Sequence, residues 1–252
     1  MFLTKTRRAA VFLFAALTLC ASCSTRLSGE IYSDGRAKLV LDSALLPAMS
    51  GLLKNFAARG GNDSAVILDA GVLNKAFTLM TGIESSELRN VAGNRVEGTI
   101  VISNIGLFLN NSAGGLAAPD AAKQPEFAVW ERKPSGGGAF NITINRDTGR
   151  QFLSLLAPEL VDYLSALMAP VVTGEVINKV GYLELVSAVY GKAVADDLAA
   201  AELSIAVSFP GPVESVAGGT FRGSQTEFKM PLLDLLVLDT PVIYDVRWTP
   251  WR

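Results

Sequence analysis

Apolar and polar residues alternate along several short segments of this chain, a pattern typical of half-buried β-strands. In residues 27–42, LSGEIYSDGRAKLVLD, the alternation occurs on both sides of Asp34-Gly35, a pair that favours a tight turn, so we predict a hairpin. Residues 110–125 are rich in Ala, Gly and Pro and are expected to form a loose connection. Alternation predicts a second strand pair over 87–104 and further strands over 127–133, 138–146, 202–209, 212–223 and 242–248.

Between these strands, apolar residues recur at helical spacing. Residues 46–61 predict a helix that ends at Gly60-Gly61, and Asp69 can cap a second helix. The pattern from 147 to about 201 is also helical, with breaks at Pro158 and at 170–174. Helices grouped between runs of antiparallel strands indicate an α+β fold: a mainly antiparallel β-sheet with several amphipathic helices packed on one face.

The first 22 residues, MFLTKTRRAAVFLFAALTLCAS, have the organisation of a secretory signal peptide. Lys5, Arg7 and Arg8 make the start positive, and an apolar run follows from Ala9 to about Ala21. Because a helix needs about 20 apolar residues to span a bilayer, this run is short for a retained membrane anchor, which is the alternative. We expect the segment to direct export and then to be removed.

Both cysteines of the chain, Cys20 and Cys23, lie at the end of that run in the order C-x-x-C. A redox pair would open a helix after a strand in a thioredoxin-like unit, and this pair does not lie in such a context. A zinc site would need two further ligands, but the chain has no other Cys and no His. The segment instead resembles the lipobox of bacterial lipoproteins, in which a Cys after two small residues is acylated and becomes the mature N-terminus.

Cys23 is the predicted lipidation site, because the residues before it, Ala21 and Ser22, are small. The pattern departs from the usual lipobox in that Cys20 occupies the Leu position, while at Cys20 itself the bulky Leu19 precedes the cut. A plain signal-peptidase cut near Ala21 or Ser22 is the competing interpretation. The predicted organisation is a lipoprotein signal peptide over 1–22, a short tether over 23–26 and a single α+β domain over 27–252.

The composition limits the chemistry of the mature chain. There is no histidine, so the side chain most often used as a general base near neutral pH is absent. Residues 23–252 carry 24 acidic and 19 basic side chains without a basic tract, which argues against a nucleic-acid partner. No metal site, cofactor or catalytic residue is predicted.

Two groups of residues could carry chemistry but are interpreted as structural. The loop Gly218–Ser224 has the outer glycine spacing of a phosphate-binding loop without its Lys, so we expect a β-turn or bulge. No spacing brings two carboxylates together for acid–base work, and we expect the following acids to be solvated: Asp196, Asp197, Asp234, Asp239 and Asp245.

The predicted helices are apolar on more than one side, as in MAPVV and YLELVSAVY. Such a layer either fills a large core or encloses a cavity that accepts an acyl chain, because ligand pockets are concave and mostly apolar. Both interpretations stay open at the level of sequence, and no ligand-binding residue is assigned.

Two segments resemble the LppM-type bacterial lipoproteins. One is the hairpin after the predicted lipidation site, CSTRLSGEIYSDGRAKLVLD. The more specific one is SIAVSFPGPVESVAGGTFRGSQTEFKMPLLDLL, in which Phe209-Pro210-Gly211 and Gly218-Gly219 separate short strands before a Pro-Leu-Leu turn. VEGTIVISNIGLF is a weaker third match, and the middle of the chain is unmatched.

The resemblance implies an envelope lipoprotein with an α+β domain on the periplasmic or surface side, associated with binding of lipids or glycolipids. It carries over no catalytic residue. LppM-type proteins often continue into a C-terminal transmembrane helix, whereas this sequence stops at DVRWTPWR, so we expect anchoring by the N-terminal lipid alone.

These features predict a non-enzymatic, lipid-anchored protein of the cell envelope, at the outer membrane or cell surface and not in the cytoplasm. Its partner would be the membrane, through the N-terminal lipid, and its ligand a lipid, glycolipid or other amphiphile held in an apolar cleft between sheet and helices. The alternatives are a structural or adhesive surface lipoprotein that acts through protein contacts, and a hydrolase that uses carboxylates. Protein partners are unknown.

Overall fold

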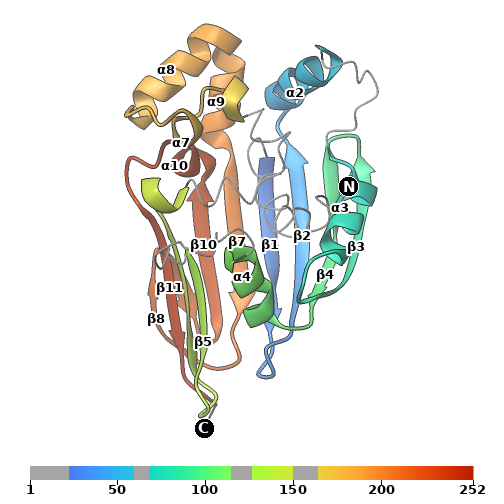
Figure 1. The fold of residues 1–252 in the computed structure, drawn as a ribbon, viewed down its shortest axis with the longest axis vertical. Coiled ribbons are helices and arrows are strands. Elements are labelled where there is room, and N and C mark those ends of the chain that lie inside the picture. Colours follow the sequence, from blue (N-terminus) through green and yellow to red (C-terminus); the bar gives the residue numbers. More distant parts are fainter. Residues whose placement is uncertain (1–22, 60–67, 115–126, 150–163, 252) are drawn as a thin grey trace, which may run out of the picture.

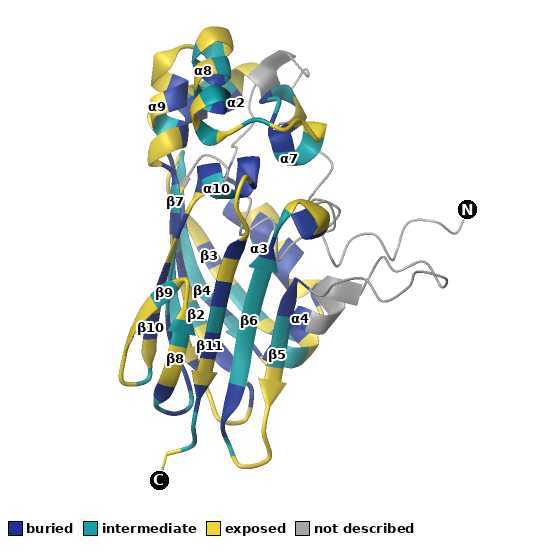
Figure 2. Cartoon of the chain, turned by 90° about the vertical axis from the view of Figure 1, so that its left-hand side faces the viewer, coloured by how far each residue is buried: buried dark blue, intermediate teal, exposed yellow. Residues whose placement is uncertain are grey.

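Two β-sheets face each other, and helices lie across one end of them (Figures 1 and 2). The computed structural model describes residues 23–59, 68–114, 127–149 and 164–251. The larger sheet has the strand order β3-β4-β2-β1-β7-β10-β9. Its strands are β1 (Cys23–Ile31), β2 (Ala37–Leu45), β3 (Ile83–Ala92), β4 (Arg95–Ile102), β7 (Glu202–Ser208), β9 (Gly219–Arg222) and β10 (Gln225–Pro231).

The smaller sheet has four strands in the order β5-β6-β11-β8. They are β5 (Ala128–Arg132), β6 (Gly138–Ile144), β8 (Val213–Ala217) and β11 (Val242–Trp248). Neighbouring strands in both sheets are antiparallel except β1 and β7, which run parallel with Thr25 opposite Leu203. The α+β class and the mainly antiparallel pairing are therefore confirmed, whereas the division into two sheets is a feature that strand periodicity does not specify.

Three helices cover the end of the larger sheet where β1 begins and β2 ends: α2 (Pro47–Arg59), α8 (Lys179–Tyr190) and α9 (Lys192–Ala200) (Figure 1). We call these three helices the helical end. The other described helices are α3 (Ala70–Thr78), which packs on β3, α4 (Ile105–Gly114), which packs on β5, α7 (Pro170–Thr173) and α10 (Leu232–Val237). None of the helices in the described ranges has both the length and the apolar composition needed to cross a bilayer.

Several predicted elements are confirmed by the structure. The hairpin is formed by β1 and β2, with Ile31 opposite Ala37 and Gly35 in the left-handed region at a φ of 89°. Asp69 caps α3, since its Oδ1 accepts hydrogen bonds from the backbone N–H groups of Gly71 at 2.7 Å and Val72 at 3.2 Å. Pro158 and Gly60-Gly61, where breaks were predicted, lie outside the described residues.

Other expectations differ from the structure. Residues 23–26, expected to form a tether, are the first residues of β1. Helix α4 begins at Ile105 in a stretch for which no element was predicted, and its residues from 110 onward were expected to form a loose connection. Strand β10 was missed, although its burial alternates along QTEFKMP, with Thr226, Phe228 and Met230 buried.

The helical end is held together by a polar contact between residues far apart in the sequence. Asp197 of α9 accepts hydrogen bonds at its Oδ2 from the backbone N–H groups of Ala48, at 2.7 Å, and Met49, at 3.2 Å. These N–H groups lie in the first turn of α2 and have no partner within their own helix. The prediction that Asp197 is solvated was wrong, because its carboxylate caps another helix.

Candidate functional site

The inward faces of the two sheets enclose an apolar cavity of about 140 Å³. Residues two apart on a strand share a face, which places Ile205 and Val207 of β7 opposite the inner residues of the smaller sheet. The described residues of the lining present only apolar surface, and they include one turn of α4. The lining residues are Leu27, Ile31, Leu39, Ile102, Ile105, Phe108, Leu109, Phe127, Ala128, Phe140, Ile142, Ile144, Ile205, Val207, Phe209, Phe228, Met230 and Tyr244.

The size of the cavity limits what it can hold. A cavity of roughly 150 Å³ with apolar walls stays dry and can accept a molecule as small as benzene. Pockets that bury larger ligands have volumes of about 300–1,000 Å³. The cavity as it stands therefore accommodates one small apolar group, and a longer chain would require the two sheets to move apart.

The two sheets are joined more firmly on one side than on the other. On the joined side, the Tyr244 hydroxyl of β11 donates to Thr226 Oγ1 of β10 at 2.5 Å, and the Tyr244 ring stacks on Phe228 with 4.6 Å between ring centroids. Gly218 also connects β8 of the smaller sheet directly to β9 of the larger one. On the opposite side, α4 covers β5 and contributes Phe108 and Leu109 to the cavity wall. Separation of the sheets on that side would break no pairing between the described strands.

The cavity is electrically neutral. Among the described residues that line it, Tyr244 is the one with a titratable group. Burial raises the pKa of its hydroxyl, while the hydrogen bond with Thr226 acts in the opposite direction. Thr226 Oγ1 in turn donates to the Val207 carbonyl at 3.2 Å. The lining thus offers packing surface to a ligand but no group for acid–base chemistry.

An aromatic cluster extends from the cavity, between the two sheets, toward the end of β11 at Trp248. Trp248 lies between Trp130 and Phe209, with ring centroids 4.9 Å from each, and Trp130 is 6.1 Å from Phe140. Within the described part of the chain, Trp248 Nε1 is buried without a hydrogen-bond partner. Because two tryptophans lie in or beside this cluster, their fluorescence should respond to a change in the packing of the sheets.

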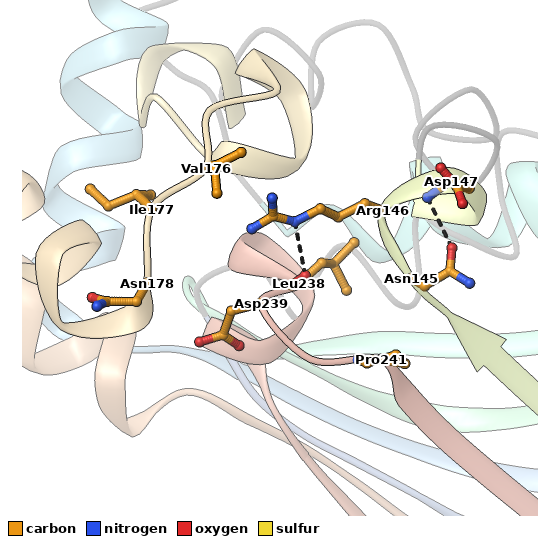
Figure 3. A pocket seen from close by; sticks show the side chains of 9 residues that line it. All are labelled: Asn145, Arg146, Asp147, Val176, Ile177, Asn178, Leu238, Asp239 and Pro241. Atoms are coloured by element: carbon orange, nitrogen blue, oxygen red, sulfur yellow. Dashed lines mark hydrogen bonds between the residues drawn. The ribbon is translucent and has the colours of Figure 1, made fainter.

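A larger but open and polar groove, of about 770 Å³, lies between the smaller sheet and the loop before α8 (Figure 3). Arg146 crosses it and donates from Nε to the Leu238 carbonyl at 3.1 Å, so it satisfies the C-terminal end of α10. Asn145 Oδ1 accepts from the backbone N–H of Asp147 at 2.9 Å (Figure 3). The polar groups of this groove are thus used at least in part to join neighbouring segments.

Beside this groove, two of the acids expected to be solvated bind a lysine instead. Lys179 Nζ lies 2.8 Å from Asp234 and 3.6 Å from Asp239, and the hydrogen bond to Asp234 is the main cause that raises the pKa of Lys179. Asp245 also has a partner, since it accepts from Asn141 Nδ2 at 3.2 Å. Asp196 fits the expectation, because its ion pair with Lys192 is exposed.

The structure places the remaining predicted residues as follows. Cys23 is the first residue of β1, opposite Leu45, and Cys20 lies outside the described residues. The Gly218–Ser224 loop forms β9 and the turn to β10, as expected for a β-turn. Across the described ranges, no three Cys, Asp or Glu side chains gather in a way that could hold a metal ion.

The predicted apolar cleft lies elsewhere than expected. We predicted it between sheet and helices, whereas the described cavity lies between two sheets with α4 at one side. Its lining residues come from strands throughout the chain, and no local pattern in the sequence relates Leu27 to Ile142 or Phe228. The alternation in 138–146 and 225–231 could have identified inward-facing residues, but not that they face each other.

Comparison with known proteins found one likeness and two negative results. No family model matches the sequence, and no curated protein matches it. Among solved structures, the chain matches the NMR structure of the folded domain of LppM from Mycobacterium tuberculosis, with 11% identity and a TM-score of 0.39. The match covers 92% of this chain and 91% of that domain. The matched protein is of the type that the sequence segments resemble.

Proposed function

We propose that this protein is a non-enzymatic, lipid-anchored component of the cell envelope that binds the apolar part of a lipid or other amphiphile between its two sheets. The observation that carries the proposal is the cavity itself: the described residues of its walls come from both sheets and offer apolar, uncharged surface. A ligand whose reactive or charged groups must be recognised would need polar side chains at the site. An acyl or isoprenoid chain needs only apolar surface.

The joined and unjoined sides of the sandwich indicate how a chain longer than the cavity would be accommodated. The Tyr244–Thr226 hydrogen bond and the Gly218 connection hold one side, so the sheets part on the side of α4. There the contacts to be replaced are apolar, including those of Phe108 and Leu109, and the ligand would restore them. The polar end of the amphiphile would remain outside, in water or at a membrane surface.

The anchoring part of the proposal rests on Cys23. The basic and then apolar residues before it predict export, and two small residues precede it. Acylation of Cys23 would leave the mature chain without a thiol, because Cys20 would leave with the signal peptide. Stable anchoring requires more than one acyl chain, which diacylglyceryl modification supplies.

The binding part is tested by photo-crosslinking of the full-length protein in membranes with a fatty acid that carries a diazirine on its chain. We expect crosslinks to map to residues of the cavity wall, notably α4 and β6. Ala128→Met adds Cγ, Sδ and Cε inside the cavity and should reduce these crosslinks several-fold, because methionine fills irregular apolar spaces.

The matched control is Ala217→Met, the same change at an exposed position of β8 in the same sheet, which should leave crosslinking unchanged. Crosslinks confined to exposed residues, or an equal yield from the parent protein and Ala128→Met, would show that the cavity does not bind the chain. The mass of the N-terminal peptide separately tests acylation of Cys23.

A further inference from the structure

We propose that the helical end, formed by α2, α8 and α9, rests on the bilayer that holds the acylated N-terminus, with the outer side of α8 in contact with lipid. This inference rests on the proposed acylation of Cys23. It concerns the orientation of the molecule and its contact surface, and it is independent of whether the cavity binds a ligand.

The first support is the place of Cys23 in the sheet. Cys23 lies opposite Leu45, and α2 begins at Pro47, two residues further along. On the other side of β1, β7 starts at Glu202 immediately after α9, which ends at Ala200. Both neighbours of β1 therefore lead directly into helices of the helical end at the level of Cys23 (Figure 1).

The second support is the lack of a flexible linker between the proposed lipid anchor at Cys23 and the folded domain. β1 begins at Cys23 itself, and Thr25, two residues later, is only 2% exposed. Its hydroxyl forms a buried hydrogen bond with Ser43 Oγ at 2.7 Å, so the strand cannot fray beyond this point without leaving both groups unpaired. Two extended residues span about 7 Å, so acyl chains on Cys23 hold the helical end at the membrane surface.

The third support is the surface of α8 and the loop before it. Val176 is 84% exposed and Val180 is 67% exposed, and Ala188 also lies on the outer side of the helix. Lys179 is turned toward Asp234, which leaves Glu184 as the exposed charge of this helix and Glu175 as that of the loop before it. A helix that is largely apolar on its outer side as well as its inner side is typical of one covered by lipid or protein.

The position of the opposite end follows from the length of β1. Nine residues at about 3.3 Å each span roughly 30 Å, so the turns at 32–36 and 223–224 lie that far from the membrane. The C-terminal end of the chain lies at the same end of the molecule as these turns (Figure 1). Trp251, the last described residue, is 68% exposed, which matches the 67% of Val180. The two residues thus form a matched pair of probe positions at opposite ends of the molecule.

The test places one environment-sensitive NBD fluorophore on the full-length acylated protein, at Val180→Cys or at Trp251→Cys. The acylated chain has no other thiol, so labelling is specific. Each protein is reconstituted in vesicles of phosphatidylcholine and phosphatidylglycerol, with or without phospholipid that carries a doxyl quencher. We expect emission at position 180 to shift to the blue and to fall at least two-fold with the quencher, and emission at position 251 to be unaffected.

Every outcome bears on the inference. If the N-terminal peptide carries no acyl groups, both the proposed anchoring and the proposed orientation are wrong. An acylated protein whose position 180 is not quenched would overturn the orientation alone and leave the anchoring intact. Equal quenching at both positions would mean that no particular end faces the bilayer, and a blue shift at 180 without lipid quenching would indicate that protein covers α8 instead.

Discussion

Replacement of Asp197 by Ala should weaken the junction between α9 and α2. The carboxylate accepts two hydrogen bonds from the first turn of α2, so the variant leaves the N–H groups of Ala48 and Met49 without this partner. Loss of an N-cap costs about 0.5–2 kcal/mol, and hydrogen bonds to a charged group contribute about 1.5–3 kcal/mol. Because the contact is partly exposed, we expect a loss of about 2 kcal/mol in the free energy of unfolding.

The adjacent residue supplies the control. Asp196 belongs to the same helix but pairs with Lys192 in an exposed i, i+4 ion pair, which contributes only about 0.3–0.5 kcal/mol. Asp197→Asn keeps an acceptor oxygen and removes the charge, so its loss should lie between those of Asp196→Ala and Asp197→Ala. For a chain of this size, 1 kcal/mol corresponds to about 2–4 °C in Tm.

The assay is urea unfolding of the full-length protein in detergent micelles, followed by circular dichroism, with Tm as a second measure. Asp197→Ala should lower Tm by about 4–8 °C and Asp196→Ala by about 1 °C. Equal losses from the two alanine variants would refute the reasoning, because they would show that Asp197 acts only through general surface charge. An Asp197→Asn variant as unstable as Asp197→Ala would show that the charge matters and the acceptor does not.

Two further predictions concern local conformation and pH. Gly218→Ala should lower the free energy of unfolding by more than about 3 kcal/mol, because φ is +78° and a Cβ would lie 1.9 Å from the Ile243 carbonyl oxygen. Gly223→Ala, at φ +64° in open space, should lower it by about 1 kcal/mol. Equal losses in urea unfolding would contradict the predicted clash. Burial raises the pKa of Tyr244 above its usual 10.0, so the folded state keeps a proton that the unfolded state loses, and this stability is full below pH 10 and falls as the pH rises above it. Between about pH 9 and pH 11, the unfolding free energy of Tyr244→Phe should therefore decline less steeply than that of the parent protein. Equal slopes for the two proteins would show that other groups cause the decline.

Local patterns were sufficient to predict many of the elements. The β1–β2 hairpin followed from alternation around Asp34-Gly35, and the start of α3 followed from the capping residue Asp69, because both depend on contacts within a few residues. Helix α4 was missed, since its sequence IGLFLNNSAG combines a short apolar run with poor helix formers. Strand β10 was visible in the alternation of QTEFKMP but lay between stronger signals.

The candidate site could be predicted in character but not in position. The high content of apolar residues and the lack of histidine indicated a site that binds an apolar ligand and carries out no acid–base chemistry. The place of the cavity depends on which strands face each other, and a strand's period of two specifies a face without naming the partner opposite it. Asp197 illustrates the same limit, because the N–H groups that it binds belong to residues nearly 150 positions earlier.

The sequence by itself determined the α+β class, the predicted signal peptide and the neutral, apolar character of the interior. It also excluded a redox pair and a zinc site at Cys20 and Cys23. These properties depend on composition and on neighbours along the chain. Only the tertiary structure decided that β1 pairs in parallel with β7, that the strands divide into two facing sheets, and that Cys23 begins a strand at the helical end. Such features arise from contacts between distant segments, whose free energy depends on packing in space and leaves no periodic trace in the sequence.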